Sequence, residues 1–332
     1  MTMVLQIFAV DGIGEVVAHD DIAEIIVNSL EAPLMDGDVV VVTSKIVSKA
    51  AGLATTTDRE IVIAEETDRI VARRGQTRIV RTHHGLTLAA AGIDASNIEL
   101  GQIIPLPREP DRDARELRQR LKSLAQVDLA VIITDTAGRA WRIGQIDIAI
   151  GAAGIRPNLD FAGVEDSYGN VLAVTSPAIA DEIAGAADLV AEKLGGNPVV
   201  IVRGIPAEWL LPDGDAGASA LIRDEDGDLF GLGARDAVIA ATSDEESPRG
   251  FPLDSESSVE ELLDAARIGV DANAADIRIL PSGNLQVYPK RPDPGQQDWL
   301  AMGALAERLR ILAKAMRIPC VVVFGAHNAV VE

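Results

Sequence analysis

Short apolar runs separated by segments with helical periodicity are the feature that most limits how this chain can fold. Brief runs rich in Val and Ile are typical of buried strands. None of them approaches the roughly 20 apolar residues of a membrane span. We therefore expect a soluble protein built around a sheet, with strands at Val4–Val10, Val39–Val42, Leu129–Thr134, Val171–Ser176 and Pro198–Gly204.

The segments between these runs are of mixed type. Arg59–Ala64 predicts a further strand that leads into a helix ending at Arg73 and Arg74, and Thr77–Asn97 predicts a hairpin followed by a Gly-containing loop. Strands and helices do not alternate as regularly as in a doubly wound sheet. The expected fold class is therefore α+β, an irregular mixed α/β arrangement. Helical patterns cover Asp20–Leu30, Asp111–Leu124 and Ile179–Leu194.

Length and a change in composition indicate two folded regions. The chain has 332 residues, and a typical domain has about 150. We assign residues 1–233 to a first domain, 234–258 to a helix and an acidic linker, and 259–332 to a small α/β C-terminal region. Ser243–Ser258 is polar and contains Pro, which is typical of an exposed loop. The expected C-terminal elements are helices Val259–Ala266 and Trp299–Met316 and strands around Arg278, around Val287 and at Val321–Phe324.

Charge and composition exclude several classes of function. A net charge of −21 and an aromatic content of 3% argue against nucleic-acid binding, which needs a basic surface or stacking side chains. The single cysteine, Cys320, lies in an apolar run and is interpreted as a buried strand residue in a protein of a reducing compartment. The N-terminus does not resemble a signal peptide, so we expect a cytoplasmic location and no membrane association. The histidines lack metal-ligand spacing: His19, His83, His84 and His327.

The densest group of polar residues is TDTAGRAWRIGQ, Thr134–Gln145, directly after an apolar strand. Asp135 and Thr136 offer the oxygen ligands that Mg²⁺ and Mn²⁺ prefer, and Arg139 and Arg142 offer guanidinium groups for phosphate. A plain turn does not need this density of polar side chains, so we favour a functional role. The chain lacks GxxxxGK[ST], GxSxG, and a GxGxxG motif after a strand.

Three other polar segments fit either a site or an ordinary turn. VVTSKIVSK, Val41–Lys49, places two Ser-Lys pairs at the end of a buried strand, which suits phosphate oxygens or a solvated strand end. AAAGIDASN offers Asp94 and Asn97 as oxygen ligands or as caps of a helix start. GVEDSYGN, Gly163–Asn170, fits a polar turn.

In this order, the segments resemble the coenzyme F420-0:glutamate ligase family, the γ-glutamyl ligases of deazaflavin maturation. The resemblance covers about residues 4–233 and rests on DGDVVVVTSKIVSKAAG, THHGLTLAAAGIDASN, TDTAGRAWRIGQIDIAIGAAGI, DSYGN and ADEIAGAADLVAEKLGGNPVVIVRG. It implies an acid–amino-acid ligase that joins L-glutamate to the carboxylate of F420-0, a lactyl-phospho-deazaflavin. GTP would be consumed to form an acyl phosphate, with release of GDP and phosphate. It also implies a homodimer.

The resemblance assigns roles to individual residues. It implies catalytic roles for Asp94, Asp135 and Lys49. It implies that Mg²⁺ or Mn²⁺ is held by Asp94, Asp135 and Thr136, and a monovalent cation is a further candidate cofactor. It implies that GTP is contacted by Ile13, Gly14, Glu15, Val16, Ser44, Lys49 and Asn97. Weaker candidates for binding anions are Arg139, Arg142 and Gln145.

The chain departs from the family pattern in two ways. Thr134 and Ala140 stand where the third motif usually has a serine and a proline, and neither change removes an expected ligand. In many actinobacterial relatives a flavin-binding, nitroreductase-like domain is fused to the ligase. The region after residue 233 is too short for that domain, so we expect no FMN binding there and assign it no role.

Two other functions remain compatible with the sequence. One is a nucleotide-dependent kinase or amide ligase that acts on a different carboxylic acid. The other is a non-catalytic homologue that senses nucleotide. The joint presence of Lys49, Asp94, Asn97 and Asp135 favours catalysis over sensing.

Overall fold

The chain forms two compact units, Met1–Ile222 and Arg223–Glu332, which are described separately. The computed structural model describes residues 4–192, 195–211, 216–224, 228, 230–242, 257–268 and 274–326. Of the expected acidic linker, residues 243–256 lie outside the described residues.

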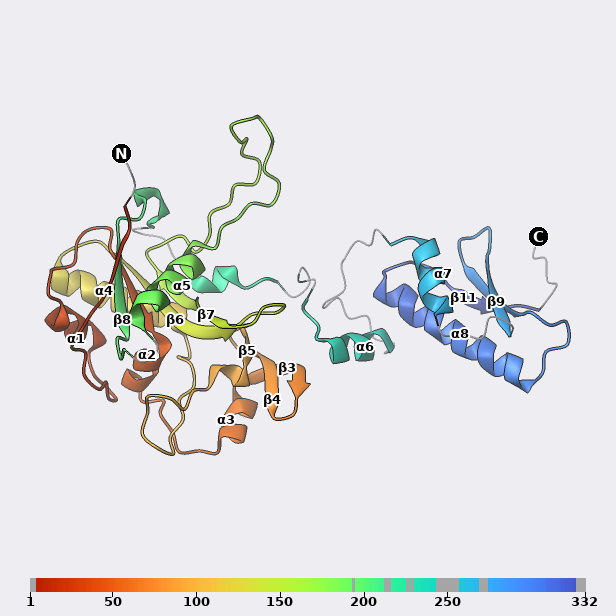
Figure 1. Ribbon diagram of the computed structural model, residues 1–332, viewed down its shortest axis with the longest axis horizontal. Helices are drawn as coiled ribbons and strands as arrows, with labels where there is room; N and C mark the ends of the chain where they lie inside the picture. The colour runs from red at the N-terminus through yellow and green to blue at the C-terminus, as the bar shows by residue number, and fades with distance from the viewer. Residues whose placement is uncertain are drawn as a thin grey trace. The chain divides into compact units, whose positions relative to one another are not determined.

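A five-stranded mixed sheet, with strand order β1-β8-β2-β6-β7, forms the centre of the first unit (Figure 1). Only β2 and β6 run parallel, and the other neighbours are antiparallel. Thr43 at the end of β2 pairs with Thr134, so the segments that follow these two residues begin side by side. The strands are β1 (Gln6–Ala9), β2 (Val39–Thr43), β6 (Ala130–Gly138), β7 (Gln145–Ala153) and β8 (Val199–Arg203).

Helices cover both faces of this sheet, which explains why its central strands are apolar without alternation. Val40 and Val42 belong to a core shared with helices α1 and α4, and Val39 and Val41 belong to a second core shared with α5. Helix α2 follows β2 with no intervening loop. The helices that accompany this sheet are α1 (Ile22–Ser29), α2 (Ser44–Ala50), α4 (Pro110–Ala125) and α5 (Ile179–Ala191).

A smaller sheet, β3-β4-β5, stands beside the first and corrects one expectation. The predicted strand at Arg59–Ala64 is helix α3 (Arg59–Glu65), and the predicted helix before Arg74 is strand β3 (Thr67–Arg74). The Asp58 side chain accepts a hydrogen bond from the backbone N–H of Glu60 at 2.9 Å and caps the helix, which outweighs the β propensity of its Ile and Val residues. The hairpin partners are β4 (Thr77–Thr82) and β5 (Thr87–Ala89), followed by the short helix η1 (Ala90–Gly92).

The prediction of a strand at Val171–Ser176 is also wrong. This segment forms one side of a long projecting loop, in which residues 157–178 fold back on themselves (Figure 1). Backbone hydrogen bonds such as Leu172 N–H to Val164 O, at 2.8 Å, hold the two sides together, but the pairing is too irregular to form a ladder. Val174 is 91% exposed, so the apolar run that predicted a buried strand is instead a projecting surface.

The second unit contains the helices and strands expected from the sequence. A three-stranded sheet, with order β11-β10-β9, packs with α7 and α8 around a core that includes Leu262, Leu285, Val287, Met302 and Leu309. Ser258 and Glu261 form a capping box at the start of α7. Its elements are α6 (Ala234–Thr242), α7 (Val259–Arg267), β9 (Ala275–Ile279), β10 (Leu285–Pro289), α8 (Gln296–Ala315) and β11 (Val322–Phe324).

The two units confirm the α+β fold class, since helices and largely antiparallel sheets are combined without regular βαβ repetition. Among the described residues, no helix is long and apolar enough to cross a membrane.

Candidate functional site

The ends of the parallel strands β2 and β6 bring two of the sequence motifs into contact. Ser44 is the first residue of α2, and Asp135 lies in β6 directly after the Thr43–Thr134 pair. The Ser44 hydroxyl donates a hydrogen bond to Oδ1 of Asp135 at 3.0 Å, and the Ser44 side chain is buried. The strand register therefore joins the VVTSK and TDTAG segments.

Asp135 is the most perturbed carboxyl group near this edge of the sheet. Its pKa is raised to about 7, chiefly by burial and also by the nearby carboxylates of Asp147 and Asp94. The hydroxyl of Ser44 and the backbone N–H of Thr136 act in the opposite direction. Three carboxyl groups thus influence one another in a partly buried place, where a cation would be strongly stabilised.

Asp147 was not among the residues predicted to form a site. It lies on β7, opposite Thr136 in the hairpin register. Its two carboxylate oxygens accept hydrogen bonds from the hydroxyls of Thr134, at 3.0 Å, and Thr136, at 2.8 Å. The sequence does show an acidic residue, Asp147, in a segment that can form a strand. Its position opposite the TDT motif follows only from the hairpin register, which the sequence did not supply.

Asp94 comes from a different part of the chain and reaches the same region through an ion pair. Its carboxylate lies 2.7 Å from Nζ of Lys45, which also donates to the Ser96 hydroxyl at 3.0 Å. Burial acts to raise the pKa of Asp94, but the Lys45 ammonium and the Ser96 N–H and hydroxyl lower it overall. Asp94 is therefore ionised at neutral pH, whereas Asp135, with a pKa of about 7, is only partly ionised there.

Lys49 lies one helical turn after Lys45 on α2, so the two ammonium groups share one face of the helix. The Lys49 side chain is only 9% exposed, and its Nζ contacts Oε1 of Glu15 at 2.5 Å and the Asn97 carbonyl oxygen at 2.9 Å. Glu15 belongs to the loop after β1, and its side chain is 70% exposed. A nearly buried lysine is thus held by one exposed carboxylate.

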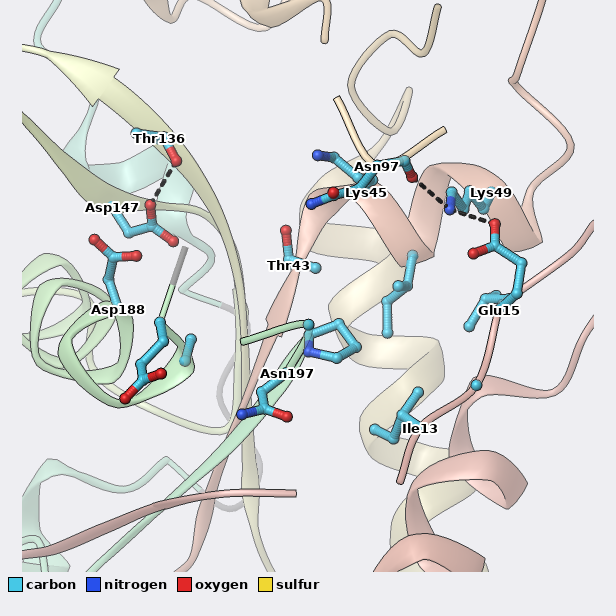
Figure 2. A pocket seen from close by; sticks show the side chains of 17 residues that line it. Ile13, Glu15, Thr43, Lys45, Lys49, Asn97, Thr136, Asp147, Asp188 and Asn197 are labelled. Atoms are coloured by element: carbon cyan, nitrogen blue, oxygen red, sulfur yellow. Dashed lines mark hydrogen bonds and ion pairs between the residues drawn. The ribbon is translucent and has the colours of Figure 1, made fainter. Parts of the chain in front are cut away.

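Part of this network, including Lys45, Lys49 and Asp147, lines a cavity of about 460 Å³. Figure 2 shows Lys45 and Lys49 on one side of it and Asp147 and Asp188 on the other. Its lining residues are Ile13, Gly14, Glu15, Val16, Thr43, Lys45, Ile46, Lys49, Asn97, Thr136, Asp147, Asp188, Ala191, Glu192, Gly196, Asn197 and Pro198. The cavity therefore has a cationic side on α2 and an acidic side on β7 and α5.

The structure brings most of the predicted site residues together here. Ile13, Gly14, Glu15, Val16, Lys49, Asn97 and Thr136 all line the cavity. Ser44, Asp94 and Asp135 do not line it. Asp94 is bound to the lining residue Lys45, and Ser44 and Asp135 are bound to each other.

The three weaker anion-binding candidates lie elsewhere. Arg139 and Arg142 stand in the turn of the β6–β7 hairpin, Gln145 begins β7, and none of the three lines the cavity. Arg139 donates to the carbonyl oxygen of Ile143 at 3.2 Å, and Arg142 and Gln145 are exposed. The position of Arg139 is therefore that of a residue that holds the turn in shape.

Two acidic lining residues at the end of α5 were also missed. Asp188 lies in the last turn of this helix, and Glu192 follows it with a positive φ of 52°. The C-terminal end of a helix dipole favours cations, and the last turn of α5 has no basic residue. Acidic residues at an unfavourable helix end were the available sign that this segment serves a ligand.

The oxygen atoms of these side chains are suitable ligands for a divalent metal, although in the structure they form hydrogen bonds and ion pairs with neighbouring side chains. Across the described part of the chain, no three His, Cys, Asp or Glu side chains are grouped as a metal site. Asp94 is engaged with Lys45, and Asp147 with two threonines. Carboxylate and hydroxyl oxygens are nevertheless the ligands that Mg²⁺ and Mn²⁺ prefer.

The first unit is thus the domain of a ligand-binding enzyme, with a charge-divided cavity at the edge of a mixed sheet. Residues 12–204 match the family model described as F420-0:Gamma-glutamyl ligase. The match spans more than half of the chain and lies within the first unit. The chain belongs to this family of ligases.

Curated relatives agree with the family model. The coenzyme F420:L-glutamate ligase of Methanothermobacter thermautotrophicus is 38% identical over 254 residues, which are 69% of this chain and 99% of the relative. The protein of the same name from Methanopyrus kandleri is 40% identical over 64% of this chain and 91% of its own length. That from Methanosarcina acetivorans is 38% identical over 61% and 87%.

Proposed function

We propose that this protein is a GTP-dependent ligase that joins L-glutamate to the carboxylate of the coenzyme F420 precursor F420-0. The observation that carries the proposal is the charge-divided cavity, with two lysines on one side and carboxylates on the other, in a chain of this ligase family. An amide forms from a carboxylate only after the carboxylate has been activated. A site for this reaction must therefore bind a phosphate donor and an amine together, which are ligands of opposite charge.

The cationic side suits the phosphate donor. Lys45 and Lys49 project from one face of α2, and Lys49 is nearly buried, so its charge is little screened by water. Ammonium groups in such a place bind phosphate oxygens through charge-assisted hydrogen bonds. Because the chain as a whole has a net charge of −21, local cations are required to bind an anion here at all.

We further propose that Mg²⁺ or Mn²⁺ binds at Asp94, Asp135 and Thr136. The raised pKa of Asp135 supports this, because a cation beside it would relieve the repulsion among three carboxylates. When bound, such an ion would neutralise phosphate charge during transfer to the substrate carboxylate. A monovalent cation is a further candidate for the same acidic region.

The residues of the chain itself would position and discriminate the reactants. Lys45 and Lys49 would orient the phosphates so that the terminal phosphoryl group faces the substrate carboxylate. Attack of a carboxylate oxygen on the terminal phosphorus would then form an acyl phosphate and release GDP. Asp147 and Asp188, on the opposite side, would attract the ammonium group of glutamate. After that group loses a proton to solvent, the free amine attacks the acyl carbon, phosphate leaves, and the nitrogen loses a second proton to solvent as the amide forms.

Mass spectrometry of the reaction products tests this function. The protein is incubated with F420-0, L-glutamate, GTP and Mn²⁺, and GDP is measured in parallel. The proposal expects a deazaflavin product heavier by one or more glutamyl residues and GDP formed in step with each addition. GDP formation without a glutamylated product would instead support an acid kinase or a ligase for another carboxylic acid.

Glu15→Gln should strengthen the binding of phosphate chains. In the structure, Oε1 of Glu15 forms an ion pair with Nζ of Lys49 at 2.5 Å, so an incoming phosphate must compete with Glu15 for the ammonium group. Removal of this charge should raise the affinity for inorganic tripolyphosphate about fivefold, which corresponds to the free energy of one ion pair with an exposed partner. Isothermal titration calorimetry measures the change. Glu109→Gln removes an exposed carboxylate that pairs with Arg112 outside the cavity, and it should leave the affinity unaltered.

We also propose a homodimer formed through the projecting loop and the β6–β7 turn. Large apolar side chains are exposed on both segments, for example Ile143, which is fully exposed, and Tyr168, at 90% exposure. Surfaces of this kind on soluble proteins mark interaction sites. In a homodimer, the same surface of a second copy is the natural partner.

The double variant Tyr168→Asp, Val174→Asp should shift the protein from dimer to monomer at micromolar concentration, because it places charges in the proposed contact. Sedimentation velocity measures the change. Leu100→Asp is the control, since Leu100 is fully exposed on a different loop and should keep the dimer. A dimer that persists in the double variant contradicts this interface.

A further inference from the structure

A second cavity of about 490 Å³ adjoins the first across the Glu15–Lys49 ion pair. The two cavities share the lining residues Glu15, Val16, Lys49 and Asn97, which form their common wall. The other residues of the second cavity are Val17, Ala18, Gly52, Ala54, Ile98, Glu99 and Gln102. It therefore lies between the loop after β1, the end of α2 and the loop after Asp94.

The order of charged groups gives the bound nucleotide a direction. Asp94 pairs with Lys45, and Lys49 stands one turn further along α2, where the second cavity begins. Side chains one turn apart on a helix are separated by about 6 Å, which is comparable to the length of a short phosphate chain. A nucleotide with its terminal phosphate near Lys45 thus has its inner phosphates at Lys49 and its nucleoside in the second cavity.

The chemistry of the second cavity suits a flat base with hydrogen-bond donors. Val17, Ala18 and Ala54 supply apolar surface for the faces of a ring. Glu99 and Gln102 supply polar atoms, and Nε2 of Gln102 donates to Oε2 of Glu99 at 2.9 Å, which orients the carboxylate. An ionised carboxylate only accepts hydrogen bonds.

Guanine presents adjacent N–H and NH₂ donors on one edge, and adenine has no such pair. We infer that the second cavity binds the base of the nucleotide and that the Glu99 carboxylate selects guanine by accepting both donors. This inference rests on the proposed nucleotide-dependent function and adds the specificity-determining residue. Glu99 is exposed without a ligand, and a base bound against it would shield its carboxylate from water, so a base without this donor pair would leave the carboxylate poorly partnered.

Glu99→Gln tests the selectivity. Dissociation constants for GDP, ADP and IDP are measured by calorimetry with Mg²⁺ present. The wild-type protein should prefer GDP to ADP by at least about tenfold, with IDP in between because inosine lacks the NH₂ group. Glu99→Gln should reduce the preference for GDP over ADP to within about threefold, since the amide keeps the shape but loses the charge. Glu31→Gln changes an exposed carboxylate that lines neither cavity and should alter nothing.

Ala54→Trp tests the location independently of Glu99. Ala54 is exposed at the rim of the second cavity, so a larger side chain fills the cavity without disturbing the core. The variant should bind GDP at least about tenfold more weakly and bind inorganic tripolyphosphate as wild type does, because the phosphate-binding side is untouched. Equal losses for both ligands, or an unchanged preference for GDP in Glu99→Gln, overturn the inference. Failure of the ligase proposal would look different, with selective nucleotide binding but no glutamylated product.

Discussion

Asp135→Asn should lower glutamyl ligation by about 10²- to 10³-fold while the protein remains folded, because the amide removes the charge that would hold the divalent ion. Asparagine keeps the size of the side chain and still accepts the hydrogen bond from Ser44. Initial rates with GTP and Mn²⁺ measure the effect. Asp68→Asn is the matched control, since Asp68 is exposed on β3, and it should retain full activity. Unchanged turnover in Asp135→Asn would refute the metal assignment.

The same variant has a second, independent readout in its stability. The pKa of Asp135 is about 7 in the folded protein, above its ordinary value of 3.8, so the folded state binds the proton more tightly than the unfolded state. This group's contribution to the free energy of unfolding is therefore complete below about pH 4 and is lost as the pH rises through about 7. Without metal, Asp135→Asn should melt at a higher temperature than wild type at pH 8, and the difference should shrink at pH 5. A lower melting temperature at pH 8 would contradict the assigned repulsion.

Lys49→Met should weaken GTP binding about 10- to 100-fold, the range for loss of a hydrogen bond to a charged group. Lys49 is nearly buried and lines both cavities, so no other described cation takes its place at their common wall. Met keeps the aliphatic length that packs beside α2, and Glu15 is exposed enough to be solvated after its partner is lost.

Titration of GTP into the variant, with turnover at saturating GTP in parallel, separates binding from catalysis. Lys122→Met is the control, because Lys122 pairs with Asp128 at 2.8 Å on α4 and lines neither cavity. It should bind GTP as wild type does. If Lys49→Met also binds GTP normally, the nucleotide does not use this side of the cavity.

The parts of the fold that could be predicted from the sequence were those in which one local signal dominates. The uninterrupted Val run of β2 and the charged amphipathic pattern of α4 each allow one structure. Arg59–Glu65 was misjudged because its Ile and Val residues favour a strand, whereas the Asp58 cap and burial of Val62 and Ile63 favour a helix. The Asp58 cap is a local signal and the burial of Val62 and Ile63 is a tertiary one, and together they outweigh the β propensity of the segment.

The residues of the candidate site differ in the same way, since some follow from a local motif and others depend on the tertiary structure. Asp135, Lys49 and Asp94 could be proposed from the sequence because each stands in a motif that is polar next to an apolar strand or a turn. Asp147 and Asp188 were missed because their importance depends on pairing across a hairpin and on the end of a helix that faces the cavity. Arg139 shows the converse, since proximity in sequence to Asp135 did not place it in the cavity.

The direct passage of β2 into α2, with no loop between them, divides the cavity into two kinds of wall. Lys45 and Lys49 lie on α2, which continues directly from β2, so their backbone is held by helix and ladder hydrogen bonds and opens only when the sheet itself opens. Glu15 and Asn97 lie on loops outside any strand or helix. A ligand that enters the cavity therefore meets charges that are already in place on α2. The conformational entropy lost on binding is lost mainly by the loops that carry Glu15 and Asn97.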